Sequence, residues 1–141
     1  MPQQHPYRVY QSTNVQTADQ RQLILMLYDG AIRFLGKGAG KIAAGDMEGA
    51  HNYLVRSRQI VAELLATLRP EKAGEVGQNL KRLYLYCFNR IVEANLLKDA
   101  EIVTEVAHIL ETLREGWANT RPAARPPAEM PGQSKRINLR G

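Results

Sequence analysis

The chain has 141 residues, of which 44% are hydrophobic and 23% are charged, and its formal net charge is +5. This length and apolar content suffice for one domain with a hydrophobic core and are too small for two. No apolar run approaches the roughly 18 residues that span a bilayer, and the first residues lack the pattern of a signal peptide. We therefore expect a soluble, cytoplasmic protein without membrane insertion.

Most of the positive charge lies in the last part of the chain. Residues 119–141 hold five basic residues against one acidic residue, whereas residues 1–118 hold 14 basic and 13 acidic residues. Because the nearly neutral body has no basic run of the kind that binds nucleic acid, we expect no nucleic-acid partner. Salt-sensitive binding through the tail is the alternative. Residues 120–141 are rich in Pro, Ala and Arg, which predicts a disordered basic tail.

The first predicted helix covers about residues 18–44. Thr17 and Gln20 have the spacing of a capping box at its start. Apolar or small residues then alternate in steps of four and three, the pattern of bundle packing. This seam consists of Ile24, Tyr28, Ala31, Leu35, Gly38 and Ile42. The glycines Gly36, Gly38 and Gly40 leave two interpretations open: a close approach by another helix, or a locally weak helix.

The second and fourth predicted helices show the same alternation. Asp46 is the expected N-cap of the second helix, which Arg69 and Pro70 stop, and Asp99 is the expected N-cap of the fourth. The second seam is Met47, Ala50, Leu54, Ser57, Val61, Leu64 and Leu68, and the fourth is Ile102, Val106, Ile109 and Leu113, with Trp117 near the end. Short connections imply antiparallel neighbours. The pattern predicts an all-α, up-down-up-down four-helix bundle over residues 17–119.

The third predicted helix, residues 76–97, is apolar over about 220° of its circumference, whereas a bundle helix needs about 100°. One stripe holds Leu80, Tyr84, Cys87, Ile91 and Ala94, and a second holds Leu85, Phe88, Val92 and Leu96. Either this helix is buried by both neighbours, or it forms a docking groove for a partner helix or peptide. Cys87, the single cysteine, is expected to be a small core residue.

Residues 1–16 form a predicted N-terminal arm that cannot build a core of its own, yet it contains Tyr7 and Tyr10. Aromatic side chains in such an arm tend to pack on an apolar surface. We expect either a detachable lid on the groove or an arm without a fixed position.

The sequence offers no convincing catalytic or metal site, so we expect neither an enzyme nor a cofactor. Two Glu-x-x-His patterns begin at Glu48 and Glu105, as in di-iron bundles, but the first helix supplies no carboxylate after Asp29. Glu48, Glu93 and Glu105 also lie away from their apolar seams. Asp29 is expected to make a surface or interhelical polar contact, because it has no partner acid.

The order and spacing of several short stretches resemble the FliS family. The stretches are Pro6, Tyr7 and Tyr10; Leu25, Met26, Leu27, Tyr28, Asp29, Gly30 and Ala31; Ile60, Glu63 and Leu64; Gly74 and Glu75; Asn79 and Leu80; Leu83, Tyr84 and Tyr86; Glu93, Ala94 and Asn95; Glu105 and Val106; and Trp117. The resemblance covers about residues 7–119. The glycines from Gly36 to Gly40 and the basic tail depart from the family pattern.

The resemblance implies a four-helix cytoplasmic chaperone that binds the disordered C-terminal segment of flagellin. Such a protein prevents premature polymerisation and assists delivery to the export gate of the flagellar type III apparatus. It also implies that Tyr10 acts as a lid and Tyr7 as a neighbouring contact. We expect the client-binding groove to comprise Leu85, Phe88, Val92 and Leu96, together with Tyr84 and Ile91. Other flagellar regulators are also candidate partners. The alternative function is a structural module that self-associates through the third helix.

Overall fold

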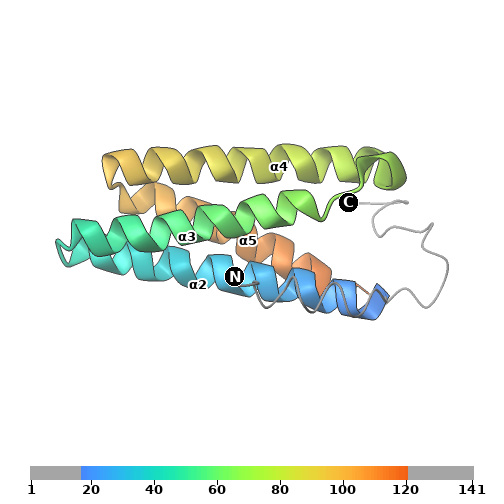
Figure 1. The fold of residues 1–141 in the computed structure, drawn as a ribbon, viewed down its shortest axis with the longest axis horizontal. Helices are drawn as coiled ribbons and strands as arrows, with labels where there is room; N and C mark the ends of the chain where they lie inside the picture. Colours follow the sequence, from blue (N-terminus) through green and yellow to red (C-terminus); the bar gives the residue numbers. More distant parts are fainter. Residues whose placement is uncertain (1–16, 121–141) are drawn as a thin grey trace, which may run out of the picture.

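The computed structural model describes residues 17–120 of the chain, apart from the side chains of residues 17–19 and 70–73. Within this range lie four helices: α2 (Thr17–Ala43), α3 (Met47–Ala66), α4 (Pro70–Leu97) and α5 (Ala100–Asn119). They run alternately in opposite directions and are joined by the short connections 44–46, 67–69 and 98–99 (Figure 1). The predicted all-α, up-down-up-down bundle is therefore confirmed.

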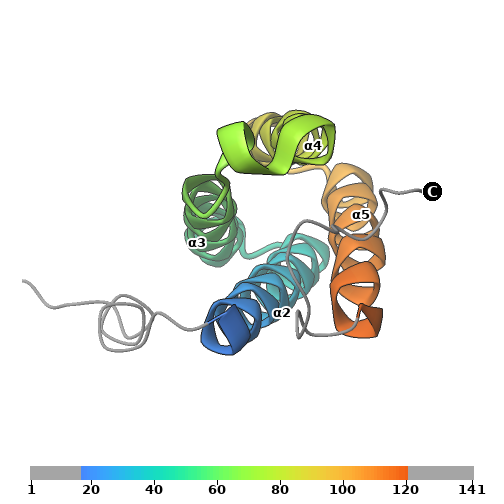
Figure 2. The same cartoon turned by 90° about the vertical axis from the view of Figure 1, so that its right-hand side faces the viewer.

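Viewed along its length, the bundle is a ring of four helices (Figure 2). Helix α2 packs against α3 and α5, and α4 packs against the same two helices from the other side, so α2 and α4 are diagonally opposite. Helix α5 lies beside α4 where the two are joined and diverges from it toward its own C-terminus (Figures 1 and 2). Of the four neighbouring pairs of helices, α4 and α5 therefore pack against each other least extensively. No helix among the described residues is long and apolar enough to cross a membrane.

Two helices begin at their predicted N-caps, whereas the side chain of Thr17, in the predicted capping box of α2, lies outside those described. The Asp46 carboxylate accepts a hydrogen bond from the Gly49 amide at 2.9 Å, which also lowers the pKa of that carboxyl group. The Asp99 carboxylate accepts one from the Glu101 amide at 2.9 Å. These bonds satisfy amides that have no partner inside their own helix, so both predicted N-caps are confirmed.

The C-terminus of α5 is closed by a residue from another helix. Arg21 of α2 donates from Nη2 to the carbonyl oxygens of Trp117 at 2.9 Å and Thr120 at 2.7 Å. These carbonyls lie at the negative end of the helix dipole, so a guanidinium there both satisfies the acceptors and compensates the dipole. Arg21 therefore ties the start of α2 to the end of α5.

The junction between α3 and α4 differs from the prediction. Helix α3 ends at Ala66, and the amide of Thr67 then bonds to the carbonyls of Glu63 and Leu64. Helix α4 begins at Pro70, six residues before the expected start at Val76. It is not continuous, because Gly74 has φ 62° and ψ −135° and bends the chain between a first short turn and the main helix. A proline can open a helix, which explains the extra turn that apolar periodicity did not indicate.

The core follows the predicted seams of α2 and α3 over most of their length. At the seam ends the prediction is wrong for Met47, which is 43% exposed in the first turn of α3, and Ile42 and Leu68 are half-buried. Members of both seams are fully or nearly fully buried: Ile24, Tyr28, Ala31 and Leu35 of α2, and Ala50, Leu54, Ser57, Val61 and Leu64 of α3. In α5 the predicted seam is confirmed in part. Ile102 and Val106 are buried as predicted, whereas Ile109 and Leu113 are half-buried, and Val103 and Leu110 are buried without having been predicted. The half-buried pair belongs to the part of α5 from its middle onward, where the helix diverges from α4 (Figure 1).

A hydrogen bond crosses the centre of the bundle. The hydroxyl oxygens of Tyr28 in α2 and Tyr84 in α4 lie 2.6 Å apart, and both side chains are buried. Burial raises the pKa of both phenols, that of Tyr84 to about 12, because the phenolate would lose its hydration. The two diagonal helices are thus held in register by a polar contact inside an apolar core.

The predicted close approach of another helix is confirmed at one of the three glycines, Gly38. A Cβ atom on Gly38 would lie 2.8 Å from Leu54 Cδ2 of α3, whereas one on Gly36 or Gly40 would have no neighbour within 4 Å. Gly38 therefore permits the close approach of α2 and α3. Neither Gly36 nor Gly40 has a packing role of this kind.

Candidate functional site: the apolar outer surface of α4

Helix α4 uses only one of its two apolar stripes for the core. Tyr84, Cys87, Ile91 and Ala94 are buried, and Tyr84 and Ile91 are each 1% exposed. The sequence predicts that these two residues line the client-binding groove, but both are buried in the bundle and lie beneath the surface. The second stripe lies at the edge of the core, where Phe88 packs against it while Leu85 and Leu96 are exposed. The central-burial interpretation therefore holds for the first stripe and does not hold for the second.

The second stripe lies on the side of α4 that faces α3. Leu96 is 80% exposed and Leu85 is 41% exposed, while Phe88 and Val92 are half-buried. The guanidinium carbon of Arg58 in α3 lies 5.8 Å from the centre of the Phe88 ring, so a cation from the neighbouring helix covers part of that ring. We call these four residues, Leu85, Phe88, Val92 and Leu96, the α3-side strip.

A second group of exposed apolar residues lies on the opposite side of α4, toward α5. Leu97 is 62% exposed, Tyr86 is 43% exposed and Leu83 is 36% exposed. The phenol of Tyr86 donates a hydrogen bond to Glu105 of α5 at 2.6 Å, so this side of α4 faces α5. We call Leu83, Tyr86 and Leu97 the α5-side strip. Sequence reasoning missed it because these residues fall outside the two stripes, although a wheel of every apolar position in α4 would have included them.

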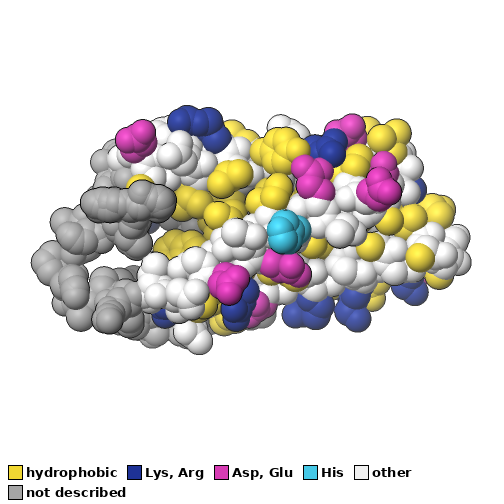
Figure 3. All heavy atoms as spheres, turned by 180° about the vertical axis from the view of Figure 1, so that it is seen from behind, with side chains coloured by type: hydrophobic (Ala, Val, Ile, Leu, Met, Phe, Trp, Pro, Cys, Tyr) yellow, Lys and Arg dark blue, Asp and Glu magenta, His cyan; other side chains and the backbone are white. Residues whose placement is uncertain are grey.

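The α5-side strip continues across the gap where α5 diverges from α4. Figure 3 shows apolar side chains gathered between α4, along the top, and α5 in the middle of that view. Leu80 of α4 and Ile109 and Leu113 of α5 are only partly buried while packing against the core. Apolar surface therefore flanks α4 on both sides. Exposed apolar side chains on two sides of one helix are typical of a docking site.

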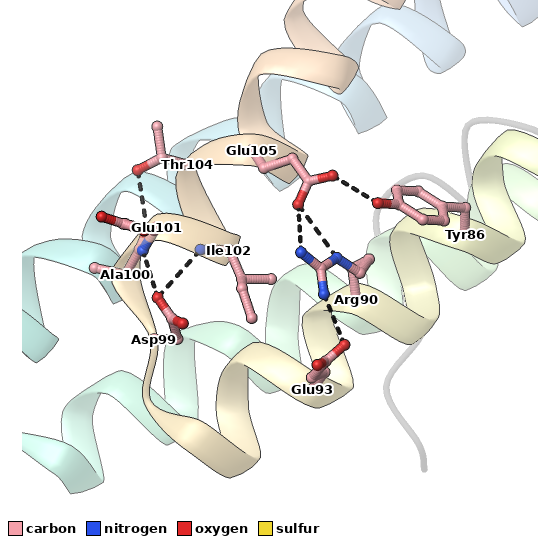
Figure 4. A network of polar contacts seen from close by, with 9 residues as sticks. All are labelled: Tyr86, Arg90, Glu93, Asp99, Ala100, Glu101, Ile102, Thr104 and Glu105. Atoms are coloured by element: carbon pink, nitrogen blue, oxygen red, sulfur yellow. Dashed lines mark hydrogen bonds and ion pairs between the residues drawn. The ribbon is translucent and has the colours of Figure 1, made fainter.

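A polar network borders this surface near the connection between α4 and α5 (Figure 4). Arg90 donates to Glu105 at 2.7 Å and to Glu93 at 2.8 Å, and Glu105 also accepts from Tyr86. The hydrogen bonds from Tyr86 and Arg90 stabilise the carboxylate, so they lower the pKa of Glu105. Because Arg90 is engaged by both carboxylates, the network fixes how α4 and α5 meet.

The network lines a shallow open hollow of about 350 Å³. Its walls are formed by Arg90, Asp99, Glu101, Ile102 and Glu105. Four of these five residues are charged, so the hollow does not suit the apolar face of a partner helix. Within residues 17–120, no group of three or more His, Cys, Asp or Glu side chains among those described is placed to hold a metal ion. The hollow is the polar rim of the apolar surface.

Most residues that carry the resemblance to the FliS family contribute to core packing or to contacts between helices. Leu27 and Tyr28 are in the core, and Gly30 is buried where a Cβ would lie 3.2 Å from Ile60 Cδ1. Asp29 accepts a hydrogen bond from Arg114 of α5 at 2.5 Å, which confirms the expected interhelical polar contact. These residues therefore hold α2 against α3 and α5.

Two further motif residues lie at opposite ends of the bundle. Asn95 Nδ2 in α4 lies 3.0 Å from His51 Nδ1 in α3, next to the exposed Leu96. Trp117 packs partly buried against the core. The predicted lid residues Tyr7 and Tyr10 lie outside the described residues.

An antiparallel four-helix bundle with an apolar helix surface outside its core is a small helical protein that presents a docking face. A sequence profile described as "Flagellar protein FliS" matches residues 3–124. Similar proteins named "Flagellar secretion chaperone FliS" occur in Bacillus subtilis (strain 168), with 33% identity over 114 residues, and in Salmonella typhimurium (strain LT2), with 36% identity over 111 residues. These matches span 81% and 78% of this chain, and 84% and 82% of the relatives.

A third relative of the same name, from Campylobacter jejuni, is 32% identical over 111 residues, which are 79% of this chain and 87% of the relative. The profile covers the whole bundle, and the relatives are matched over most of their length. The chain therefore belongs to the FliS family of flagellar secretion chaperones.

Proposed function

We propose that this chain binds the disordered C-terminal segment of flagellin in the cytoplasm, prevents its premature polymerisation and assists its delivery to the flagellar type III export gate. The observation that carries this proposal is the apolar surface of α4 that the core leaves uncovered, with Leu96 80% exposed. The names of the relatives support the chaperone class. Chaperoning of this kind needs no catalytic residue and no cofactor.

The α3-side strip suits an amphipathic client helix. Leu85, Phe88, Val92 and Leu96 recur in steps of three and four along one side of α4, so they form a continuous row about 16 Å long. A client helix with its own apolar residues at similar spacing can lie along such a row. The α5-side strip provides a second row for a segment that wraps around α4.

Binding must offset the entropy of ordering the client. Coupled folding and binding typically buries about 1,000–3,000 Å² and costs at least about 2–5 kcal/mol in ordering. One row of four side chains is too small for the upper part of that range, so we propose that the client uses both sides of α4. In this proposal Tyr84 and Ile91 support the surface from beneath, without touching the client.

The sharpest test is calorimetric titration of the full chain with the flagellin C-terminal segment from the same organism, comparing the wild type with Leu96→Asp. Because Leu96 is 80% exposed, the variant should fold normally. It should bind at least about tenfold more weakly, since a carboxylate at the interface would lose its hydration. Saturable binding with a negative heat-capacity change is expected for the wild type.

The matched control is Met26→Asp, because Met26 is 51% exposed on α2 and lies away from α4. Equal losses in the two variants would contradict the assignment of the α3-side strip. Phe88→Asp and Val92→Asp extend the test to the half-buried members, with far-UV circular dichroism as the check on folding. Failure of the wild type to bind, together with a dimeric mass in sedimentation, would instead support self-association through α4.

The same titration tests the proposed lid. If Tyr10, with Tyr7 beside it, competes with the client for the surface, Tyr10→Ala should bind the client more tightly. Weaker binding by that variant would show that Tyr10 contacts the client directly.

A further inference from the structure

A second surface with a different chemistry lies on the outer side of α2 and α3. Phe34 of α2 and Tyr53 of α3 stack with their ring centres 5.9 Å apart and their planes 25° from parallel. Both side chains are half-buried. The pair bridges the two helices away from the core, and Lys and Arg side chains gather along the α2 edge of the bundle in Figure 3.

Three cations surround this aromatic pair. The guanidinium carbons of Arg33 and Arg56 lie 5.1 Å and 5.4 Å from the centre of the Phe34 ring, and Lys37 Nζ lies 6.0 Å from the centre of the Tyr53 ring. Arg33 and Lys37 are one turn apart on α2, whereas Arg56 comes from α3. Stacking on the rings holds the two guanidinium groups in place while their outer N–H groups stay in water.

These three cations have no carboxylate partner among the described residues. The ion pairs between described side chains use Lys41, Arg90 and Arg114, and they engage the carboxylates of Asp29, Asp46, Glu93 and Glu105. Arg33, Lys37 and Arg56 are all exposed. The molecule therefore carries a concentrated positive charge on α2 and α3 that its own described carboxylates do not neutralise.

We propose that this cluster, Arg33, Phe34, Lys37, Tyr53 and Arg56, docks an acidic segment of a partner protein. Guanidinium groups bind carboxylates through two parallel hydrogen bonds, and groups already held by an aromatic ring lose less freedom on binding. Single-stranded nucleic acid fits less well, because it needs free aromatic faces for base stacking. Here the two rings face each other and the guanidinium groups of two arginines lie against Phe34.

The ends of this chain do not have the charge to occupy the cluster. Residues 1–16 contain one arginine and no acidic residue, and residues 121–141 contain five basic residues and one acidic residue. The occupant must therefore come from another molecule. It can bind while α4 is occupied, because Arg56 and Arg58 point to opposite neighbours of α3: Arg56 toward Phe34 of α2, and Arg58 toward Phe88 of α4.

The test uses a fluorescein-labelled peptide of ten glutamates as the probe, titrated with the full chain and followed by fluorescence anisotropy at low salt. The wild type should bind saturably, and Arg33→Gln/Arg56→Gln should bind at least about fivefold more weakly.

The matched control is Lys81→Gln/Arg82→Gln, which removes the same charge from exposed positions on α4. That control should change affinity by less than about twofold, because distant surface charges are screened. Equal losses in the two double variants, or no saturable binding by the wild type, would overturn the proposal.

Two further measurements separate a specific carboxylate site from general positive charge. Arg33→Lys/Arg56→Lys keeps the charge but lacks the planar fork, so it should bind the peptide more weakly than the wild type, and equal binding would overturn the proposed geometry. Competition with a ten-nucleotide oligothymidylate, or with vesicles containing anionic phosphatidylserine, should displace the peptide only weakly. Stronger binding of either competitor would overturn the choice of an acidic protein segment.

Discussion

The hydrogen bond between Tyr28 and Tyr84 joins two diagonal helices at the centre of an apolar core. Tyr28→Phe removes one hydroxyl and leaves the buried Tyr84 hydroxyl without that partner, so it should reduce the free energy of unfolding by about 1–3 kcal/mol. The double variant Tyr28→Phe/Tyr84→Phe removes both polar groups and should be less destabilised than the sum of the two single variants. Urea unfolding of the four proteins measures this coupling. Simple additivity would contradict a shared hydrogen bond.

At the level of the helices, Gly38 sets how closely α2 approaches α3. Gly38→Ala would place a methyl group 2.8 Å from Leu54 Cδ2, and Leu54 is fully buried and cannot move away freely. We expect the free energy of unfolding, measured by heat or urea, to fall by about 1–3 kcal/mol.

Gly36→Ala is the matched control on the same helix, because nothing lies within 4 Å of its new methyl group. It should gain about 0.5–1 kcal/mol from helix propensity. Equal gains in the two variants would show that the helices separate easily.

The protonation state of the core affects the whole molecule. Burial raises the pKa of Tyr28, Tyr84 and Cys87 from ordinary values of 10.0 for a phenol and 9.0 for the thiol, and brings Tyr84 and Cys87 to about 12. An acid whose pKa is raised by folding stabilises the fold fully below its unfolded pKa, and that contribution is lost as the pH rises through the folded pKa. The bundle should therefore lose stability between about pH 9 and pH 12.

Urea midpoints measured across this pH range test that expectation. The variant Tyr28→Phe/Tyr84→Phe should show a shallower decline, because only Cys87 then remains of the three buried acids. Two of the six tyrosines should develop phenolate absorbance only when the bundle unfolds. Ionisation of all six in the folded protein would mean that the centre is open to water.

Sequence alone determined the helical class, the antiparallel order and most of the core. The reason is physical: alternation by four and three places one side of each helix inward wherever the helix packs, and Asp46 and Asp99 satisfy the helix amides locally. Such local signals predicted the α2 and α3 seams and both N-caps. The extra turn of α4 before Gly74 has no apolar period, so periodicity could not indicate it.

Only the tertiary structure decided which apolar residues stay outside the core. On α4, the wheel could not distinguish Tyr84 and Ile91, which lie in the interior, from Leu85 and Leu96, which lie on the surface. That division depends on where α3 and α5 contact α4, and those contacts are far apart in the sequence. The divergence of α5 and the meeting of Phe34 with Arg56 likewise arise between helices. Local patterns determine what each helix can bury, whereas the packing of its neighbours determines what it actually leaves exposed for a partner.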